Sequence, residues 1–341
     1  MIMKQTRKIL LIISAVLISL GVLMCGVSFT ASGFNLETIG VTNMKVMEKS
    51  FAPDFSVIEI DAELCALEFS QSRDDDIHIS YHIRQRDKEK RSIEIEPSQG
   101  RLVISEKLEL KWYDYIRIFG IGGAKFCIEL PQGMNTEISA STDNGSVSLE
   151  NLSTSGGVKI ETSNGKFEIK NVKTGGNLDL KTSNNTIEAE QAEISGGFTA
   201  QSSNGKIELK SVKVGGNCAA RTSNARVAFE NVKAEETEIV TSNGKVELEA
   251  VSAESMSIKT SNGKIEFSEL EILGKRLEAE SSNGAIEGSL VGSEGDYRFD
   301  CNTSNASVST PKSGEDSTKS AYFKTSNGAI NIWYSEARLT Q

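Results

Sequence analysis

A four-residue motif that occurs ten times is the feature that most constrains the fold of this chain. Each copy starts with Thr or Ser and has asparagine as its third residue, and successive asparagines are 20, 20, 20, 20, 19, 19, 21, 22 and 22 residues apart. A repeat of this length predicts an array of similar units, because each unit buries its apolar residues against its neighbours. The asparagines are Asn144, Asn164, Asn184, Asn204, Asn224, Asn243, Asn262, Asn283, Asn305 and Asn327.

The residues beside each motif alternate between apolar and polar types, which predicts β-strands. Relative to the asparagine, apolar residues recur at positions −6, −4, +3, +5 and +8, and Thr or Ser occupies position −2. The alternation shifts by one residue across Asn-Gly. We therefore expect a corner there, with the asparagine facing inward and a glycine that adopts positive φ. Paired glycines predict a second corner, at Gly156-Gly157, Gly175-Gly176, Gly196-Gly197 and Gly215-Gly216.

Two arrangements of short strands are compatible with this pattern. Asn-Gly is a strong signal for antiparallel hairpins. A parallel β-helix, or β-solenoid, with one coil per repeat also explains why the same residues recur at the same position, since stacked asparagine amides can form a hydrogen-bonded ladder. We therefore favour an all-β fold, a single-stranded parallel β-helix of about ten coils, stacked about 4.8 Å apart.

The rest of the chain divides into segments around this array. We expect a cytoplasmic N-terminus (residues 1–8), a transmembrane anchor (9–29), a spacer (30–50), an irregular, β-rich N-terminal cap (51–131), the solenoid (132–335) and a C-terminal tail (336–341). The cap is expected because the end of a solenoid exposes a sheet edge. Near the C-terminus, Lys312–Ser320 is predicted to be a loop and Ile330–Tyr334 to close the last coil.

Residues 9–29 are apolar and uncharged, and a helix of this length would span about 30 Å, the thickness of a bilayer core. Lys4, Arg7 and Lys8 precede the segment, so the positive-inside rule places the N-terminus in the cytoplasm and the solenoid outside the cytoplasmic membrane. A cleaved signal peptide is the main alternative, and lipidation at Cys25 is another. All three interpretations give an extracytoplasmic body.

Composition argues against several classes of function. The chain has 341 residues and a formal net charge of −10, which is unfavourable for binding the phosphates of a nucleic acid. Its two histidines, His78 and His82, lie four apart on a predicted strand, about 13 Å from each other, too far to bind one metal ion together. Asp74–Asp76 lacks the ligand spacing of a calcium loop. We therefore expect no cofactor, no metal and no catalytic site.

The cysteines give no clear disulfide framework. Five are present, an odd number, and one of them lies in the predicted anchor. Cys218 and Cys301 fall at inward positions of coils that are too far apart to be bridged. Cys65 and Cys127 could pair or remain free.

Two rows of charge are the most regular surface feature. A cationic row at position +2 and a glutamate row at position +4 should run in parallel along the solenoid, and their mutual pairing should relieve repulsion within each row. The rows could be a solvated face, or the cationic row could contact a repeating polymer. The cationic row is Lys166, Lys206, Arg226, Lys245 and Lys264, and the glutamate row is Glu168, Glu188, Glu208, Glu247, Glu266 and Glu287.

An aromatic cluster in the cap allows two interpretations. Trp112, Tyr113 and Tyr115 lie close together in the segment Lys111-Trp112-Tyr113-Asp114-Tyr115. Their rings could plug the end of the solenoid, or they could contact a glycan or a membrane surface.

The Thr-Ser-Asn-Gly repeats with flanking apolar strands, following one apolar N-terminal segment, resemble the bacterial "putative adhesin" β-strand-repeat family of cell-envelope proteins. The resemblance covers roughly residues 50–335 and implies a right-handed β-helix without catalytic residues. Asn185, Ala225 and Ala306 depart from the corner glycine.

We thus expect a non-enzymatic, membrane-anchored protein for envelope interaction or adhesion, with an envelope polymer or envelope protein as partner. The alternatives are a sensory or regulatory protein that binds a stress ligand or a partner receptor, and a scaffold that polymerises end to end.

Overall fold

The computed structural model describes residue 14 and residues 16–24, 44–84, 90–109 and 124–335, and it divides into two units, Met1–Lys45 and Val46–Gln341. In the first unit, residues 16–24 are helical. No helix within the described residues is both long and apolar enough to cross a membrane. The predicted N-terminus (1–8), most of the predicted anchor and spacer, and the tail (336–341) lie outside the described residues.

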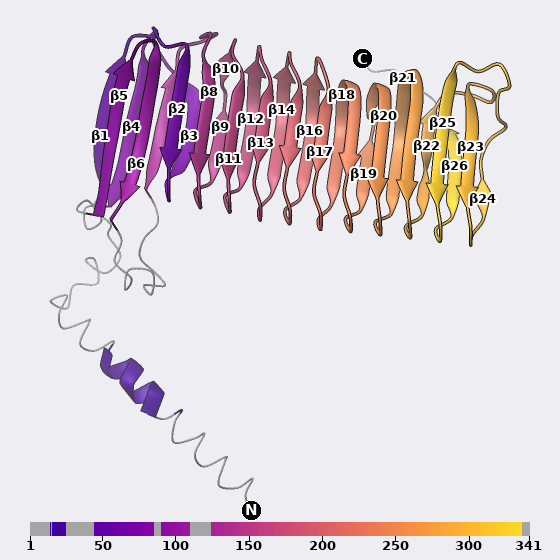
Figure 1. Ribbon diagram of the computed structural model, residues 1–341, viewed down its shortest axis with the longest axis horizontal. Coiled ribbons are helices and arrows are strands. Elements are labelled where there is room, and N and C mark those ends of the chain that lie inside the picture. The colour runs from indigo at the N-terminus through magenta and orange to yellow at the C-terminus, as the bar shows by residue number, and fades with distance from the viewer. Residues whose placement is uncertain (1–13, 15, 25–43, 85–89, 110–123, 336–341) are drawn as a thin grey trace, which may run out of the picture. The chain divides into compact units, whose positions relative to one another are not determined.

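The second unit is all-β, and its strands form one continuous sheet that winds into a stack of coils (Figure 1). Each repeat contributes a strand before the motif and a strand after it, and neighbouring repeats pair in parallel. The predicted parallel β-solenoid is therefore confirmed, and the antiparallel alternative is wrong for the repeats.

The strands of the repeats form two faces. Face A holds the strands before the motif, and face B those after it. Face A contains β8 (Glu137–Thr142), β11 (Val158–Thr162), β13 (Leu178–Lys181), β15 (Phe198–Gln201), β17 (Cys218–Arg221), β23 (Tyr297–Thr303) and β25 (Lys319–Thr325). Face B contains β9 (Val147–Glu150), β10 (Ser153–Thr154), β12 (Phe167–Thr174), β14 (Ile187–Ile194), β16 (Ile207–Val214), β19 (Val246–Glu249), β22 (Ile286–Val291), β24 (Val308–Ser309) and β26 (Ile330–Ser335). Three longer strands continue through the second corner from face B to face A: β18 (Val227–Val240), β20 (Ser252–Thr260) and β21 (Ile265–Ser281).

The core lies between the two faces and consists of columns of equivalent residues. At position +3, Phe167 pairs in register with Ile187, which pairs with Ile207, and all three are fully buried. Complete burial of such a side chain contributes about 1.5–3 kcal/mol. Because the same address is apolar in coil after coil, this contribution repeats along the stack and fixes the register.

The asparagine ladder exists, but on the outside of the corner. Nine of the ten side-chain amides donate to the Oδ1 of the asparagine in a neighbouring coil, and Asn144 at the start of the ladder only accepts. An example is Asn204 Nδ2 to Asn184 at 2.8 Å, and both of these residues are exposed. The prediction that the asparagines face inward is therefore wrong. The buried polar residue is the Thr or Ser at position −2: Ser202 is 3% exposed, donates to the Asn185 carbonyl at 3.1 Å and accepts from the Gly205 N–H at 2.8 Å.

The corner glycine is required for space, and not for a positive φ. None of the motif glycines has positive φ. A Cβ on Gly244 would instead lie 1.6 Å from the carbonyl oxygen of Ala225 in the preceding coil. The corners at Asn185 and Ala225 lack glycine, and neither has the hydrogen bond from the corner N–H to the position −2 hydroxyl that the glycine corners make.

A third irregularity lies at position +7, where seven successive coils have a non-glycine residue with positive φ. Examples are Asn151, Asn171 and Ala250, at φ 51–52°. This bulge lets positions +5 and +8 both face the core although they are three residues apart. The spacing of the apolar residues contained that signal, and the sequence prediction did not use it.

The parallel stack begins earlier than predicted, within the segment expected to be an irregular cap. Strands β2 (Val57–Ala62) and β3 (Ala66–Gln71) pair in parallel with β8 and β9, and β6 (Arg101–Leu108) and β7 (Lys125–Leu130) pair in parallel with β2 and β3. Beyond them, β5 (Arg91–Ser98) and β4 (Ile77–Arg84) are antiparallel to β6 and β7. β1 (Met44–Phe51) pairs with β4 and occupies the end of the predicted spacer.

The last two repeats are stacked in reverse order. β26 lies between β22 and β24, and β25 lies between β21 and β23. Consequently Asn327 bonds to Asn283, and Asn305 bonds to Asn327. The prediction that Ile330–Tyr334 closes the last coil is wrong. β23 and β24 form the terminal coil, and residues 310–318 carry the chain back (Figure 1).

Removal of a buried corner hydroxyl should destabilise the protein more than removal of a ladder amide. Ser202→Ala leaves the Gly205 N–H and the Asn185 carbonyl without their partner inside the protein, at a cost of about 1–3 kcal/mol. Asn204→Ala removes the bonds to the amides of Asn184 and Asn224, which are exposed and can bond to water instead. This change should cost about 0.5–1 kcal/mol. Urea unfolding of both variants tests this order, which a larger loss for Asn204→Ala would contradict.

A methyl group at the corner should be harmful only where glycine is native. Gly244→Ala forces the corner away from the Ala225 carbonyl, and we expect a loss of about 1–3 kcal/mol. The matched control is Ala225→Gly in the preceding coil, which should change stability by less than about 1 kcal/mol. Equal melting temperatures for Gly244→Ala and the wild type would show that the close approach is not needed.

Candidate functional site: a charged groove on face B

The two charged rows lie side by side on face B and pair as predicted. Lys245 contacts Glu247 of its own coil at 2.6 Å and Glu266 of the next coil at 2.5 Å, and Lys264 repeats the pattern with Glu266 and Glu287. Hydrogen bonds from Lys245 and Lys264 lower the pKa of Glu266. Since these side chains are about one-third exposed, each pair contributes little to stability, below about 1 kcal/mol.

Pairing is uneven along the cationic row. Lys166 bridges Glu168 and Glu188, each at 2.7 Å, and Arg226 bridges Glu208 and Glu247 around the smaller Ala228. Among the ion pairs of the described residues, none includes Lys206. The ammonium group of Lys206 is thus the one in the row that a ligand could engage without breaking an internal pair.

A groove of about 690 Å³ runs along face B between the glutamate row and the outward residues at position +6. Buried residues at position +5, such as Ile169 and Leu209, form its floor. It extends from Glu168 to Glu287, six coil steps or about 29 Å. Nine glutamates and three cationic side chains line it, so its interior is acidic although the cationic row borders it.

Trp333 stands at the C-terminal end of this groove and is 52% exposed. It reaches the groove because β26 is inserted next to β22, where Ser289 pairs with Trp333. In a stack that followed the order of the repeats, the neighbouring coil would be that of Val308. The sequence analysis did not place Trp333 in a site for that reason. A local signal for it is that a large aromatic residue stands at position +6, which faces outward.

Of the other candidate residues, His78 and His82 do not line the groove. Trp112, Tyr113 and Tyr115 lie outside the described residues. His78 bonds to Asp74 at 2.7 Å and to Ser50 at 2.8 Å, whereas His82 bonds to Ser80. The hydrogen bond with Asp74 raises the pKa of His78. Within the described residues, no group of three or more His, Cys, Asp or Glu side chains could hold a metal ion.

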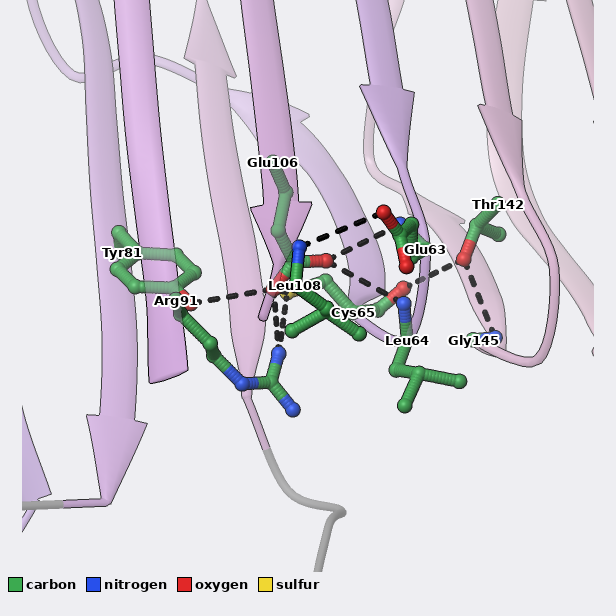
Figure 2. A network of polar contacts seen from close by, with 9 residues as sticks. All are labelled: Glu63, Leu64, Cys65, Tyr81, Arg91, Glu106, Leu108, Thr142 and Gly145. Atoms are coloured by element: carbon green, nitrogen blue, oxygen red, sulfur yellow. Dashed lines mark hydrogen bonds and ion pairs between the residues drawn. The ribbon is translucent and has the colours of Figure 1, made fainter. Parts of the chain in front are cut away.

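A buried polar network closes the N-terminal end of the stack (Figure 2). Glu106 on β6 directly follows Ser105, which pairs with Asp61 on β2, so it lies at the address that the corner Thr takes in the next coil, where Thr142 pairs with Ala62. Its carboxylate accepts from the N–H groups of Glu63 and Leu64 at 3.1 and 3.3 Å. In the regular coils, the corresponding corner N–H groups donate to a carbonyl of the preceding coil, for example Asn164 to Asp143 at 2.9 Å. The Glu106 carboxylate therefore takes the place of the backbone carbonyl that a preceding coil would supply.

Arg91 on β5 balances the charge of Glu106, and both side chains are almost fully buried. The Cys65 thiol and the Tyr81 hydroxyl also donate to Glu106 Oε1, at 2.9 and 3.2 Å. Burial and the adjacent carboxylate raise the pKa of Cys65 far above its usual value, so its sulfur is a thiol and a poor nucleophile. The network thus has the properties of a structural cap.

The four described cysteines, Cys65, Cys127, Cys218 and Cys301, are all free. Of the two pairing possibilities for Cys65 and Cys127, the structure has the unpaired one. Cys127 bonds instead to Glu68 at 3.4 Å.

Loss of the buried carboxylate should be costly because it strands the guanidinium of Arg91. For Glu106→Gln we expect a loss of about 3–5 kcal/mol in the free energy of unfolding. The control is Glu59→Gln, which breaks the exposed pair between Glu59 and Arg101 and should cost less than about 1 kcal/mol. Urea titration measures both, and similar small losses would rule out a stabilising role for the network.

The chain is similar to one known protein family and to several solved structures. The family model described as Toastrack DUF4097 matches residues 55–224 and 195–333. Similar solved structures include a "putative adhesin" from Parabacteroides merdae (14% identity, TM-score 0.36, covering 85% of this chain and 96% of that chain). Another is a "putative lipid binding protein" from Parabacteroides distasonis (13% identity, TM-score 0.35, covering 85% of this chain and 97% of that chain). A third is a "putative cell adhesion protein" from Clostridium sporogenes (12% identity, TM-score 0.24, covering 86% of this chain and 100% of that chain). No curated protein matches the chain.

Proposed function

This chain belongs to the Toastrack DUF4097 family, and from this premise we propose that it is a non-enzymatic interaction protein of the cell envelope. Its body would be displayed outside the cytoplasmic membrane, anchored through residues 9–29, as the charge asymmetry of the N-terminus predicts. Its partner would be a linear envelope polymer that lies along the groove on face B.

The observation that carries this proposal is the repetition of the groove. Every coil adds one residue to each wall, and six of the seven residues at position +4 are glutamates, with Ala228 as the exception, so a glutamate contact can be made again at multiples of about 4.8 Å. Weak contacts of this kind add by multivalency when the ligand is itself repetitive. A single compact ligand would use only part of a groove that crosses seven coils.

The lining indicates the chemistry of the polymer. Seven of the nine glutamates are in ion pairs with Lys or Arg, and the other two, Glu190 and Glu249, have none among the described residues. The two unpaired carboxylates disfavour a polyanion inside the groove, and carboxylate oxygens are good acceptors for hydroxyl groups. Trp333 provides an apolar ring at one end. The best fit is a hydroxyl-rich chain such as a glycan. The cationic row, which is one candidate contact for an anionic polymer, is largely paired with glutamates, and Lys206 is its most available member.

Cosedimentation of the full chain with purified cell-wall glycan, over a series of salt concentrations, tests the proposal. We expect binding that changes little with salt, because hydroxyl contacts are not screened as exposed charges are. Trp333→Ala should weaken binding about tenfold, or about 1.4 kcal/mol. The matched control is Tyr322→Ala on face A, which should bind like the wild type.

Two results would contradict the groove. Absence of binding by the wild type, or equal binding by Trp333→Ala, would remove the proposed contact surface. Binding that falls steeply with salt and is lost in Lys206→Glu would move the contact to the cationic row and make the polymer anionic.

A further inference from the structure

The two ends of the stack differ in how their sheet edges are treated. At the N-terminal end, β4 and β5 turn the pairing antiparallel and Glu106 takes up the corner N–H groups. At the C-terminal end, β23 and β24 have a partner strand on one side only among the strands of the described residues. The core side chains of this terminal coil are accordingly incompletely covered. Phe299 and Cys301 are half-buried, and Val308 is 44% exposed although its counterparts at position +3 are fully buried.

The loop that follows the terminal coil forms hydrogen bonds with some of the backbone groups at this edge. Gly314 N–H donates to the Tyr297 carbonyl at 2.9 Å, and Phe299 N–H donates to Ser313 Oγ at 3.0 Å. In the regular coils the equivalent backbone groups bond to the next coil, as when Val158 N–H donates to the Asn177 carbonyl at 2.8 Å. The loop therefore substitutes for a further coil, but only along the first half of β23.

The second half of β23 keeps four free backbone groups. On face A the inward residues direct their N–H and C=O groups toward the C-terminal end, as Leu178 does to Gly197 and Thr182 to Gln201. By this rule the Phe299 carbonyl, the N–H and carbonyl of Cys301, and the Thr303 N–H point outward from the stack. Within the described part of the chain, no hydrogen bond on this outer side satisfies any of the four.

We propose that this edge is a homophilic contact, at which β23 pairs in antiparallel fashion with β23 of a second copy of the chain. The four free groups are self-complementary about a two-fold axis at Cys301. The two Cys301 residues would exchange both of their hydrogen bonds, and each Thr303 N–H would donate to the Phe299 carbonyl of the other copy. This is the pattern of a hydrogen-bonded pair flanked by its neighbours in an antiparallel ladder.

The pairing also explains the exposed apolar side chains at this end. A two-fold axis normal to the sheet places face A against face A and face B against face B, so the two cores become continuous and cover Phe299 and Val308. Such an interface is isologous and closes after two copies. The N-terminal ends of the two bodies would point away from each other, which suits contact between chains held on opposing surfaces. The antiparallel N-terminal strands disfavour extension into an end-to-end polymer.

The mass of the full chain in mild detergent, measured by light scattering over a range of protein concentrations, tests the proposal. We expect a concentration-dependent dimer for the wild type and a monomer for Val308→Lys, in which two like charges meet near the two-fold axis. The matched control is Val46→Lys on β1, because Val46 is 43% exposed at the opposite end of the stack. That variant should dimerise like the wild type.

Cross-linking adds a readout that reports the register. Directly opposed residues in a hydrogen-bonded pair have Cα atoms about 5.5 Å apart, within the range that a disulfide can bridge. Oxidation by copper phenanthroline, which accepts the electrons lost by the two thiols, should link the dimer through Cys301. The Cys25→Ala variant, which lacks the cysteine of the predicted anchor, should still form this link, and Cys301→Ser should lose it. A monomeric wild type, a dimer that survives Val308→Lys, or a cross-link that persists in Cys301→Ser would each overturn the proposal.

Discussion

The close approach of one corner to the corner of the preceding coil is the constraint on which the rest of the structure depends. At seven of the ten corners this approach uses a residue without a Cβ, and at Gly244, for example, the methyl of Ala would overlap the carbonyl oxygen of Ala225. The approach also needs a small hydroxyl residue two positions before the asparagine, which accepts from its own corner and donates to the adjacent coil, as Ser202 does. Once these two contacts fix the spacing, parallel pairing and the apolar columns follow in register, and the asparagine amides are brought within hydrogen-bonding distance on the outside.

A structure that propagates in this way has to be stopped at both ends, and the chain uses different means for each. At the N-terminal end, a buried carboxylate, paired with an arginine, replaces the missing carbonyl, and β4 and β5 pair antiparallel to the stack. At the C-terminal end, the chain returns and inserts its last repeat between two earlier ones. The insertion protects the final strands within the sheet, but it leaves the terminal coil only half covered by its own loop.

The same insertion connects the fold to the candidate site. It carries Trp333 to the end of a groove whose walls come from the strictly periodic part of the stack. The periodic walls can repeat a contact but cannot define where a ligand ends, whereas a single aromatic residue at one end can. The groove and the free edge of β23 lie on different parts of the terminal region, so the proposed polymer binding and the proposed pairing of two copies would not compete for the same side chains.

The sequence by itself determined the features that depend on local periodicity. These are the strands, the burial of the apolar positions, the coil length and the pairing of the two charged rows, because each follows from which side chain an alternating strand turns inward or outward. The direction of the asparagine and the role of the corner glycine were predicted wrongly, since both depend on the distance to another coil and not on neighbours in the chain. Only the tertiary structure decided the stacking order of the last two repeats, because Asn305 and Asn327 belong to equivalent motifs that can occupy either place. The position of Trp333 beside Ser289 and the free edge of β23 follow from that order, so no pattern within a single repeat could have predicted them.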